Sequence, residues 1–411
     1  MYDVIVVGAR VAGSPLAMLL ARQGHHVLLV DRVSFPSDTI STHYIHQAGL
    51  SRLQDWGLLD RVIASGCPPI THLRFSYTDI ALRGFADPID GLTAVYCPRR
   101  TVLDKILVDA AGEAGVDVIE NFTVTELLEE GGRVTGIRGH EGDGAEVEFS
   151  AQLVVGADGA NSIVAKKVDA QIYRGAPGGC FVYYSYYSGL DWGMQHRTGF
   201  GEQQFASWPT NDGLSLVAVM RKRERFRQFR SNPDDGIQDI VSAIDSELGE
   251  ELRGAATREE RLRPMLYPDN YYRQSFGSGW ALVGDAGYHK DPFTGWGITD
   301  AFKYAQLLSE RVHEGLTGDR PMLEALAEYQ NSRDAQSQGT YELTTSISEL
   351  SLTPYYDSVF RAAGRSERYT KRFFGLIAGG ITGEDFFAPE NLAALYAEVD
   401  LPTRDRHLTA V

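Results

Sequence analysis

The first 31 residues constrain the fold of this chain more than any other stretch. The apolar, β-branched run at residues 3–7 suits a buried parallel strand. Residues 14–24 have the spacing of a helix closed by Gly24, and residues 25–32 indicate a second buried strand that ends at Asp31. Strand, glycine turn, helix, strand and acid together predict a βαβ unit of about 30 residues, the frame of a dinucleotide site.

Each part of this unit has a task in such a site. Gly8 makes the tight turn, Gly13 lets the helix approach the strand, and the helix N-terminus offers N–H groups to a pyrophosphate. Asp31 can accept hydrogen bonds from ribose hydroxyls and would repel a 2′-phosphate, which favours FAD or NAD over NADP here. The fingerprint is incomplete because Arg10 stands where a second glycine is expected, so an ordinary βαβ turn is the alternative.

Two later stretches place an aspartate at the carboxyl end of a buried strand. Residues 151–162 run from a strand into Asp158-Gly159, and residues 279–308 run from a strand into Gly284-Asp285. Ligands of open α/β sheets bind at that edge of the sheet. The alternative is that both aspartates cap structural turns.

The later of these stretches suits a flavin. Asp285 can accept hydrogen bonds from a polyol chain, and Gly295 and Gly297 allow backbone to approach a flat ring. The helix that starts near Ile298 points its positive end at negative charge on that ring. Since a reduced flavin carries such a charge, this stretch favours FAD.

The three motifs, in this order, resemble the FAD-dependent monooxygenases of the 4-hydroxybenzoate hydroxylase fold, the group A flavoprotein hydroxylases. The family pattern is GxGxxG, then DG, then GD followed by Pro and GxG; this chain has GARVAG, ADGANS and GDAGYHKDPFTGWG over roughly residues 1–340. Besides Arg10, the departures are Lys166 for arginine, Tyr288 for histidine and Thr299 for asparagine.

The resemblance implies which residues contact FAD, among them an arginine that opens an RxxLxxxL helix, here RTVLDKIL. The implied set is Gly8, Arg10, Val11, Ala12, Gly13, Asp31, Arg32, Arg100, Val124, Asp158, Gly284, Asp285, Gly295, Gly297 and Ile298.

The fold class that follows is α/β, with a Rossmann-like FAD-binding domain interwoven with an antiparallel β-sheet substrate domain and a helical C-terminal tail. Tyr-, Phe- and Val-rich runs separated by glycines favour the antiparallel sheet. We expect the FAD-binding domain at 1–70, 98–170 and 274–340, the substrate-binding β-sheet domain at 71–97 and 171–273, and a helical C-terminal cap at 341–411.

The resemblance also implies a reaction. An FAD-dependent monooxygenase would use NADPH or NADH and O₂ to hydroxylate or epoxidise a small aromatic, polyketide-like or coenzyme A-linked substrate through a flavin C4a-(hydro)peroxide, as in secondary metabolism. The stretch PFTGWGI resembles geranylgeranyl reductases as well, so an FAD-dependent reductase of that type is the main alternative. A flavin halogenase and a flavin-binding protein without turnover are further alternatives.

Several side chains are candidates for catalysis. His43 and His46 follow the second strand, and His289 lies beside the GD turn, so each is placed to relay a proton or contact substrate. Pro292 would shape the oxygen-reacting side of the flavin. The alternative for each histidine is a structural role, which is the more common one for a lone histidine.

Aromatic residues are candidates for the substrate wall. Alternation along a strand puts Tyr184 and Tyr186 on one face and Tyr183 and Tyr187 on the other. Tyr184 and Tyr186, together with Trp208 and Trp296, are the candidates, and core packing is the alternative.

Composition narrows the partners. A net charge of −16 disfavours nucleic acid. Three cysteines without a CxxC pair, and the absence of HExxH or a nucleophile elbow, give no support to a metal site, a disulfide framework or hydrolase chemistry. The sequence shows no basic leader and no apolar run of about 18 residues, so we expect a cytoplasmic protein without a membrane span. We expect it to be a monomer or a homodimer. The basic run 221–230 is either a solvated face or an anion site.

Overall fold

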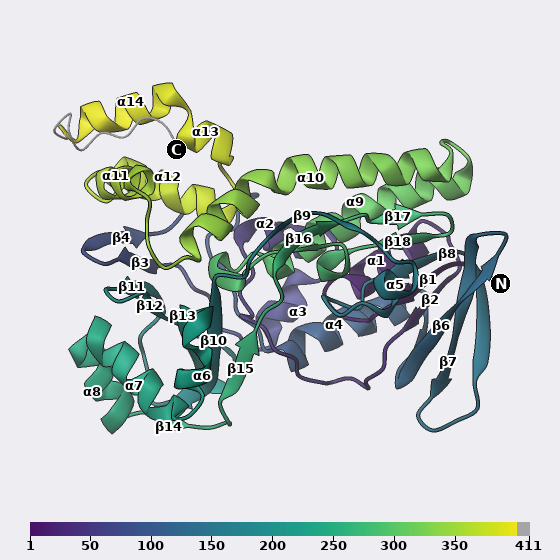
Figure 1. Cartoon of the computed structure of the whole chain (residues 1–411), viewed down its shortest axis with the longest axis horizontal. Coiled ribbons are helices and arrows are strands. Elements are labelled where there is room, and N and C mark those ends of the chain that lie inside the picture. Colours follow the sequence, from purple (N-terminus) through teal and green to yellow (C-terminus); the bar gives the residue numbers. More distant parts are fainter. Residues whose placement is uncertain (401–411) are drawn as a thin grey trace.

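The computed structural model describes residues 1–400, which form two eight-stranded sheets, a three-stranded sheet and a set of helices around them (Figure 1). The two large sheets lie at opposite ends of an elongated molecule, and α9 and α10 run along the half that holds the N-terminus.

The first sheet has the order β17-β18-β8-β1-β2-β5, with the β6–β7 hairpin joined through β7 to β8. Its strands β18, β8, β1, β2 and β5 are parallel. The strands are β1 (Tyr2–Val7), β2 (Val27–Val30), β5 (Asp117–Ile119), β6 (Phe122–Glu130), β7 (Arg133–Glu141), β8 (Val147–Gly156), β17 (Phe276–Gly277) and β18 (Trp280–Leu282).

The second sheet has the order β14-β10-β13-β12-β11-β3-β4, with β15 also paired to β10, and it is antiparallel except where β11 meets β3. Its strands are β3 (Leu73–Tyr77), β4 (Ile80–Gly84), β10 (Cys180–Ser188), β11 (Met194–Gly199), β12 (Gln203–Pro209), β13 (Ser215–Lys222), β14 (Thr257–Arg258) and β15 (Arg263–Leu266). The third sheet joins β9 (Ile172–Ala176), β16 (Asn270–Arg273) and β19 (Tyr288–His289).

Helices cover both large sheets and form the C-terminal part of the described chain. They are α1 (Gly13–Arg22), α2 (Gln47–Asp55), α3 (Leu59–Ala64), α4 (Arg100–Glu113), α5 (Ile163–Lys167), α6 (Phe226–Phe229), α7 (Pro233–Ile244), α8 (Ser246–Gly254), α9 (Gly297–Thr317), α10 (Met322–Ile347), α11 (Pro354–Ala363), α12 (Glu367–Ala378), α13 (Gly383–Phe387) and α14 (Pro389–Glu398). Single 3₁₀ turns are η1 (Asn211–Gly213), η2 (Arg223–Arg225), η3 (Gly284–Ala286) and η4 (Pro292–Thr294).

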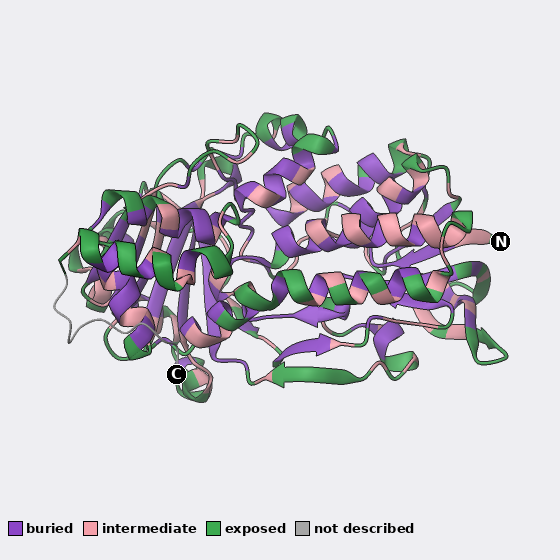
Figure 2. Cartoon of the chain, turned by 90° about the horizontal axis from the view of Figure 1, so that it is seen from above, coloured by how far each residue is buried: buried purple, intermediate pink, exposed green. Residues whose placement is uncertain are grey.

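The central strands β1 and β2 of the first sheet are buried on both faces, as their apolar sequence predicts. Val4 and Val6 of β1 belong to the main core, whereas Ile5 and Val7 belong to a second core on the opposite face. Viewed from above, buried residues fill most of the central strands and the inner faces of the helices, and exposed residues follow the outer faces of the helices (Figure 2). The β-branched run therefore forms the centre of an open parallel sheet.

The second sheet separates two further layers. Tyr184 and Tyr186 of β10 face the main core, and Tyr183 and Tyr187 face a smaller core that includes Ile237 of α7. This is the alternation that the strand pattern predicts. The sheet thus turns one face toward the dinucleotide unit and is covered on the other by α6, α7 and α8.

The fold class expected from the sequence is confirmed: a parallel Rossmann-like sheet, an antiparallel sheet and C-terminal helices. The third sheet was not foreseen, and it joins strands from segments that the sequence assigns to different domains. The division into domains stays a prediction. Of the expected cap at 341–411, residues 401–411 lie outside the described residues.

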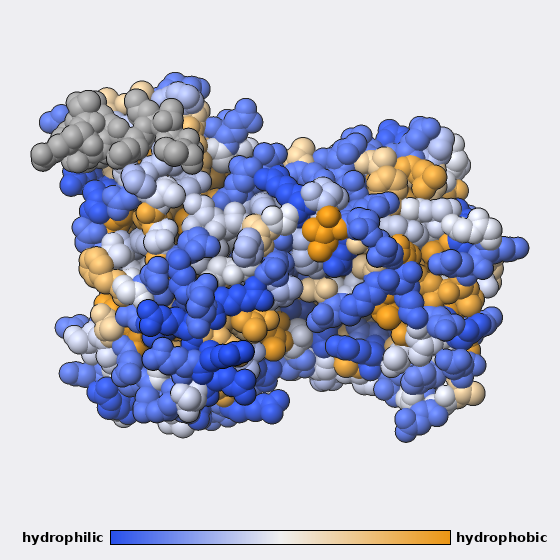
Figure 3. Space-filling model, viewed as in Figure 1, coloured by the Kyte–Doolittle hydropathy of each residue, from blue (hydrophilic) through white to orange (hydrophobic). Residues whose placement is uncertain are grey.

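The surface in Figure 3 is mostly hydrophilic, with scattered hydrophobic residues. Within residues 1–400, none of the helices combines the length and the hydropathy needed to cross a bilayer. Cys67, Cys97 and Cys180 are buried and unpaired.

Candidate functional site

The three sequence motifs meet at the carboxyl edge of the first sheet. Ala157 donates a backbone hydrogen bond to Val7 at 2.8 Å, which places the turn after β8 beside the turn after β1. Gly284, at φ +61°, lies so close to α1 that a Cβ there would be 2.9 Å from the Cβ of Ala12. Segments separated by more than a hundred residues therefore form one edge, where ligands of such sheets bind.

Glycine is needed at the first turn for two separate reasons. Gly8 has φ +106°, and a Cβ on it would lie 2.6 Å from the carbonyl oxygen of Ala157. A Cβ on Gly13 would lie 1.8 Å from the carbonyl oxygen of Gly8. Gly8 thus makes the turn and Gly13 permits the close approach of α1, which are the geometric tasks the sequence assigns to them.

Asp31 ends β2 and holds the loop around it. Its carboxylate accepts hydrogen bonds from the backbone N–H of Ala9 at 2.7 Å and of Val33 at 3.1 Å. Its carbonyl accepts one from Phe122 at 2.8 Å, so β6, which contains Val124, starts beside it. Arg32 is exposed. This corner is where the resemblance puts the adenosine end of FAD.

Buried polar atoms without a partner in the described chain indicate whether the carboxyl edge of the first sheet fits a polar cofactor. Within residues 1–400, Oγ of Ser14 in the first turn of α1 and Oδ1 of Asp158 lack hydrogen-bond partners, and Ser14 is fully buried. The other carboxylate oxygen of Asp158 accepts from the N–H of Ile163 at 2.6 Å, so this residue also caps α5, and burial raises its pKa. Helix N-terminus, hydroxyl and carboxylates fit the phosphates and hydroxyls of a dinucleotide.

The GD turn adds a second carboxylate. The side chain of Asp285 is 47% exposed, and its Oδ2 lies 3.3 Å from Nδ1 of the buried His289. Tyr271 donates its hydroxyl proton to the Asp285 carbonyl at 2.5 Å, which fixes the turn. The Asp285 side chain is therefore accessible and lies on a fixed turn, as a residue that binds a polyol chain must be.

The turn Pro292–Thr294 is held by two histidines. Nε2 of His46 lies 2.9 Å from the carbonyl oxygen of Thr294, and Nε2 of His196 lies 3.0 Å from that of Phe293. Since a carbonyl only accepts, both Nε2 atoms carry the proton. Gln204 donates to Nδ1 of His196 at 2.9 Å, whereas Nδ1 of His46 is buried and has no partner among residues 1–400.

Burial keeps both histidines neutral. It lowers the pKa of His46 to about 3, with the hydrogen bond to Thr294 acting in the opposite direction. It lowers the pKa of His196 to about 4. At neutral pH, Nδ1 of His46 is therefore a free hydrogen-bond acceptor and not an acid.

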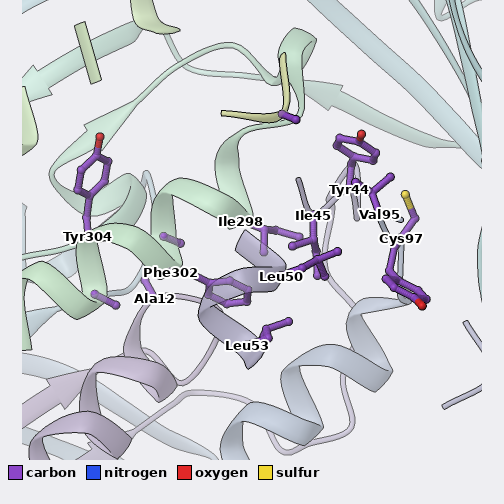
Figure 4. Packing of buried hydrophobic residues seen from close by; sticks show 14 of the residues in the cluster. Ala12, Tyr44, Ile45, Leu50, Leu53, Val95, Cys97, Ile298, Phe302 and Tyr304 are labelled. Atoms are coloured by element: carbon purple, nitrogen blue, oxygen red, sulfur yellow. The ribbon is translucent and has the colours of Figure 1, made fainter. Parts of the chain in front are cut away.

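Trp296 joins the motif to the C-terminal helices. Its ring stacks on His46 with 4.7 Å between centroids. Gly379 follows α12, and a Cβ on it would lie 2.6 Å from the Trp296 ring. Figure 4 shows how the start of α9 is fixed from the other side, where Ile298 and Phe302 pack toward Ile45 and Leu50.

A narrow cavity of about 50 Å³ opens beside this turn. Its walls are mostly apolar and come from the second sheet, from η4 and Gly295, from the segment around Tyr44, and from α10 and α12. They are Thr42, Tyr44, His46, Leu73, Arg74, Phe75, Met194, His196, Ala206, Trp208, Met220, Pro292, Phe293, Thr294, Gly295, Ile347, Phe373, Phe374 and Ile377.

The candidates named from the sequence divide into two groups. His46, Pro292 and Trp208 border the cavity, and Trp296 lies directly behind His46. Tyr184, Tyr186, His43 and His289 are absent from its walls. His43 instead hydrogen-bonds the hydroxyl of Tyr186, and Arg99 stacks on that ring at 3.8 Å. Burial, followed by the charges of Arg100, Arg99 and Arg263, lowers the pKa of His43.

Some residues that line the cavity or pair with predicted site residues were not identified from the sequence. His196 lies in a strand without a motif, and Phe373 comes from a helix whose packing is set by distant contacts. The pair of Asp104 with Arg100 could have been predicted from the sequence, because an arginine and an aspartate four residues apart on a helix form such ion pairs. In the basic run, Lys222 and Arg223 pair with Glu349 and Asp269, whereas Arg225 and Arg227 are exposed.

Comparisons with known proteins agree with this geometry. A family model described as FAD binding domain matches residues 1–344. Digeranylgeranylglycerophospholipid reductase 2 of Methanopyrus kandleri is 25% identical over 365 residues, covering 85% of this chain and 86% of that protein. The 1H-pyrrole-2-carbonyl-(peptidyl-carrier protein) brominase of Pseudoalteromonas luteoviolacea is 23% identical over 333 residues, covering 77% and 79%.

Solved structures share the fold over nearly the whole chain. The flavin-dependent brominase Bmp2 superimposes with a TM-score of 0.82 at 20% identity, covering 98% of this chain and 100% of that one. PqsL, a probable FAD-dependent monooxygenase from Pseudomonas aeruginosa, has a TM-score of 0.73 at 18% identity, covering 91% and 99%.

Asp285→Ala tests the assignment of the GD turn. The variant is expected to lose at least tenfold in FAD affinity, because a hydrogen bond from a hydroxyl to a charged group contributes about 1.5–3 kcal/mol. FAD content after gel filtration and titration of the apoprotein measure the effect. Asp357→Ala, at a half-exposed carboxylate on α11, is the control. Stoichiometric, tightly held FAD in Asp285→Ala would refute the assignment.

The neutral histidines make stability depend on pH. Their folded pKa values lie below the ordinary value of 6.5, so the unfolded chain takes up protons first as the pH falls. This contribution to stability is full above about pH 6.5 and is lost progressively as the pH falls to the folded pKa values of about 4 for His196 and about 3 for His46. His196→Gln keeps a donor for Phe293 and removes one titrating group, so its thermal midpoint is expected to fall less steeply with acidification than that of the wild type. The exposed His72→Gln serves as the control, and an identical slope in His196→Gln would contradict the account.

Proposed function

The chain belongs to the FAD binding domain family and is an FAD-dependent oxidoreductase, and from this premise we propose that it is a monooxygenase. It uses NADPH or NADH and O₂ to hydroxylate or epoxidise a small, planar and largely apolar substrate of the aromatic or polyketide-like kind. The observation that carries the proposal is the mostly apolar cavity against the turn Pro292–Gly295, where the motifs would place the flavin ring.

The residues present fit FAD. Asp31 would bind the adenosine ribose, the N-terminus of α1 the diphosphate and Asp285 the ribityl chain, and the backbone around Gly295 and Gly297 would face the ring. When bound, FAD supplies the electron transfer and the activation of oxygen, and the protein supplies position and exclusion of water.

The cavity wall is suited to hold a flat apolar body and to orient it. Phe75, Met220 and Phe373 provide apolar surface from three elements. Nε1 of Trp208 is buried without a partner among the described residues and can donate to a substrate oxygen, and Nδ1 of His46 can accept from a hydroxyl. Two polar atoms in an apolar wall fix orientation, as is usual in small-molecule pockets.

The position of α12 supports the proposal, because this helix covers one side of the cavity. Phe373, Phe374 and Ile377 form one wall, and Gly379 at the end of the helix packs on Trp296. Thr344 of α10 shares a hydrogen bond of 2.7 Å with Thr294 in the turn. α12 and the end of α10 therefore cover one side of the cavity, which would limit the access of water to the side of the turn where oxygen transfer would occur.

A reductase of the geranylgeranyl reductase type is the second candidate. The matching stretch PFTGWGI and the 25% identity to the archaeal reductase over 85% of this chain favour it. An apolar cavity also suits an isoprenoid double bond. The two candidates differ in their need for oxygen.

Reaction of the reduced protein with oxygen separates the candidates. We expect that protein whose FAD has been photoreduced without oxygen, when mixed with O₂, shows a transient absorbing species distinct from oxidised and reduced flavin. A panel of aromatic and polyketide-like compounds should then yield products that contain oxygen from O₂. Direct reoxidation with every compound, together with anaerobic reduction of isoprenoid double bonds, would support the reductase and overturn the monooxygenase.

Filling the cavity tests its role. Ala206 of β12 is fully buried and borders the cavity. Ala206→Leu adds three carbons to the wall, so substrate-stimulated oxidation of NADPH or NADH is expected to fall at least tenfold while FAD content stays at the wild-type level. Ala281→Leu, which lies in the buried first sheet and does not border the cavity, reports the effect of overpacking elsewhere. Unchanged turnover in Ala206→Leu would place the substrate elsewhere.

A further inference from the structure

The arginine that interrupts the glycine fingerprint makes contacts with two distant segments. Nη1 of Arg10 lies 2.5 Å from Oδ2 of Asp104 on α4, and Nη2 lies 2.7 Å from Oγ of Ser37 in the segment after β2. Arg100 donates to the same carboxylate from Nε at 2.9 Å and Nη2 at 3.0 Å. We name Arg10, Asp104 and Arg100 the Asp104 triad.

The triad is buried and carries an excess of positive charge. The side chain of Asp104 is 0% exposed, that of Arg100 7% and that of Arg10 22%. Two guanidinium groups face one carboxylate, which leaves a net charge of +1. Buried charges are costly unless they are balanced, so this arrangement favours an anion next to it.

The backbone adds to the positive potential. Arg100 is the first residue of the fourteen-residue α4, whose first turn contains no acidic residue. A cation at a helix N-terminus is unfavourable, because the helix dipole is positive there. The N-terminus of α1 is also close, since Ser14 donates its backbone N–H to the carbonyl of Arg10 at 3.0 Å. Within residues 1–400, the hydroxyl of that buried serine has no partner.

Other acidic groups nearby are already engaged. Asp31 accepts from the backbone of Ala9 and Val33. Asp38, next to Ser37, lies within ion-pair distance of Arg99 and Arg263. Among the described residues neither carboxylate forms an ion pair with Arg10 or Arg100, so the positive excess at the triad is left for a ligand.

We propose that the Asp104 triad replaces the second glycine of the fingerprint as a built site for the diphosphate of FAD. Arg10 is a positioning residue: through Asp104 it fixes Arg100, and through Ser37 it fixes the segment that closes the site. The inference rests on the assignment of FAD and not on the monooxygenase reaction, so it holds equally for a reductase.

The proposal predicts that restoring the consensus weakens the site. Arg10→Gly recreates GxGxxG, yet it removes one partner of Asp104, releases Ser37 and abolishes the charge excess. We expect the dissociation constants of FAD and of ADP, which carries the diphosphate without a flavin, to rise at least tenfold in the full-length apoprotein. Arg10→Lys keeps the charge without the forked contact and should lie between wild type and Arg10→Gly.

Controls separate a diphosphate effect from loss of fold. Arg365→Gly removes an exposed arginine between α11 and α12 and should bind both ligands as the wild type does. The thermal midpoint of each apoprotein reports folding, and Ser37→Ala offers a milder variant, with an expected rise of about threefold in both constants, if Arg10→Gly does not fold.

A double-mutant cycle with Asp104→Asn tests the coupling within the triad. Arg10→Gly should weaken binding less in the Asp104→Asn background than in the wild type, because Arg10 and Asp104 act through each other. The proposal would be overturned if a folded Arg10→Gly or Ser37→Ala variant bound FAD and ADP as tightly as wild type. Equal losses in Arg365→Gly, or strict additivity in the cycle, would overturn it as well. Since these titrations contain no oxygen chemistry, their failure is distinct from failure of the monooxygenase assignment.

Discussion

The close packing of α1 against the turns of the first sheet is the constraint on which the rest depends. A Cβ on Gly13 would lie 1.8 Å from the Gly8 carbonyl, and a Cβ on Gly8 would meet the backbone of Ala157 at 2.6 Å. Only this approach brings the N-terminus of α1 to the edge where β1, β8 and β18 end. The acidic turns and the Asp104 triad then lie at one edge with the Ser14 hydroxyl, which has no partner in the described part of the chain, and the backbone dipoles there suit an anionic cofactor.

The sequence predicts the frame of this site well, because its signals are local. The apolar run of β1, the alternation along β10 and each of the three motifs depend on a few neighbouring residues, and the structure has the buried strand and the alternation as expected. The role of Arg10 depends on Asp104, which is 94 positions away in the sequence. A local sequence pattern does not predict such a contact. The fingerprint alone therefore suggests a damaged site, whereas the fold shows an arginine held by two segments.

The cavity illustrates the same limit. Its walls combine strands of the second sheet, the turn after β19 and α12, which meet only when the C-terminal helices fold back onto β4. His196 is part of a strand that carries no motif, yet it holds the carbonyl of Phe293 beside the proposed flavin ring. Tyr184 and Tyr186 have the composition of a substrate wall, but they face His43 and two arginines away from the cavity. Tertiary packing, not residue type, decides which aromatic side chains border the cavity.

A crystal structure of the FAD-loaded protein tests the central claim most directly, that one edge of the first sheet binds FAD and directs its ring to the apolar cavity. The account predicts the diphosphate at the N-terminus of α1 beside Arg100, the ribityl chain at Asp285, and the ring between Thr42–Tyr44 and Pro292–Gly295, open to the cavity. A ring separated from the cavity, or a diphosphate away from α1, would contradict it.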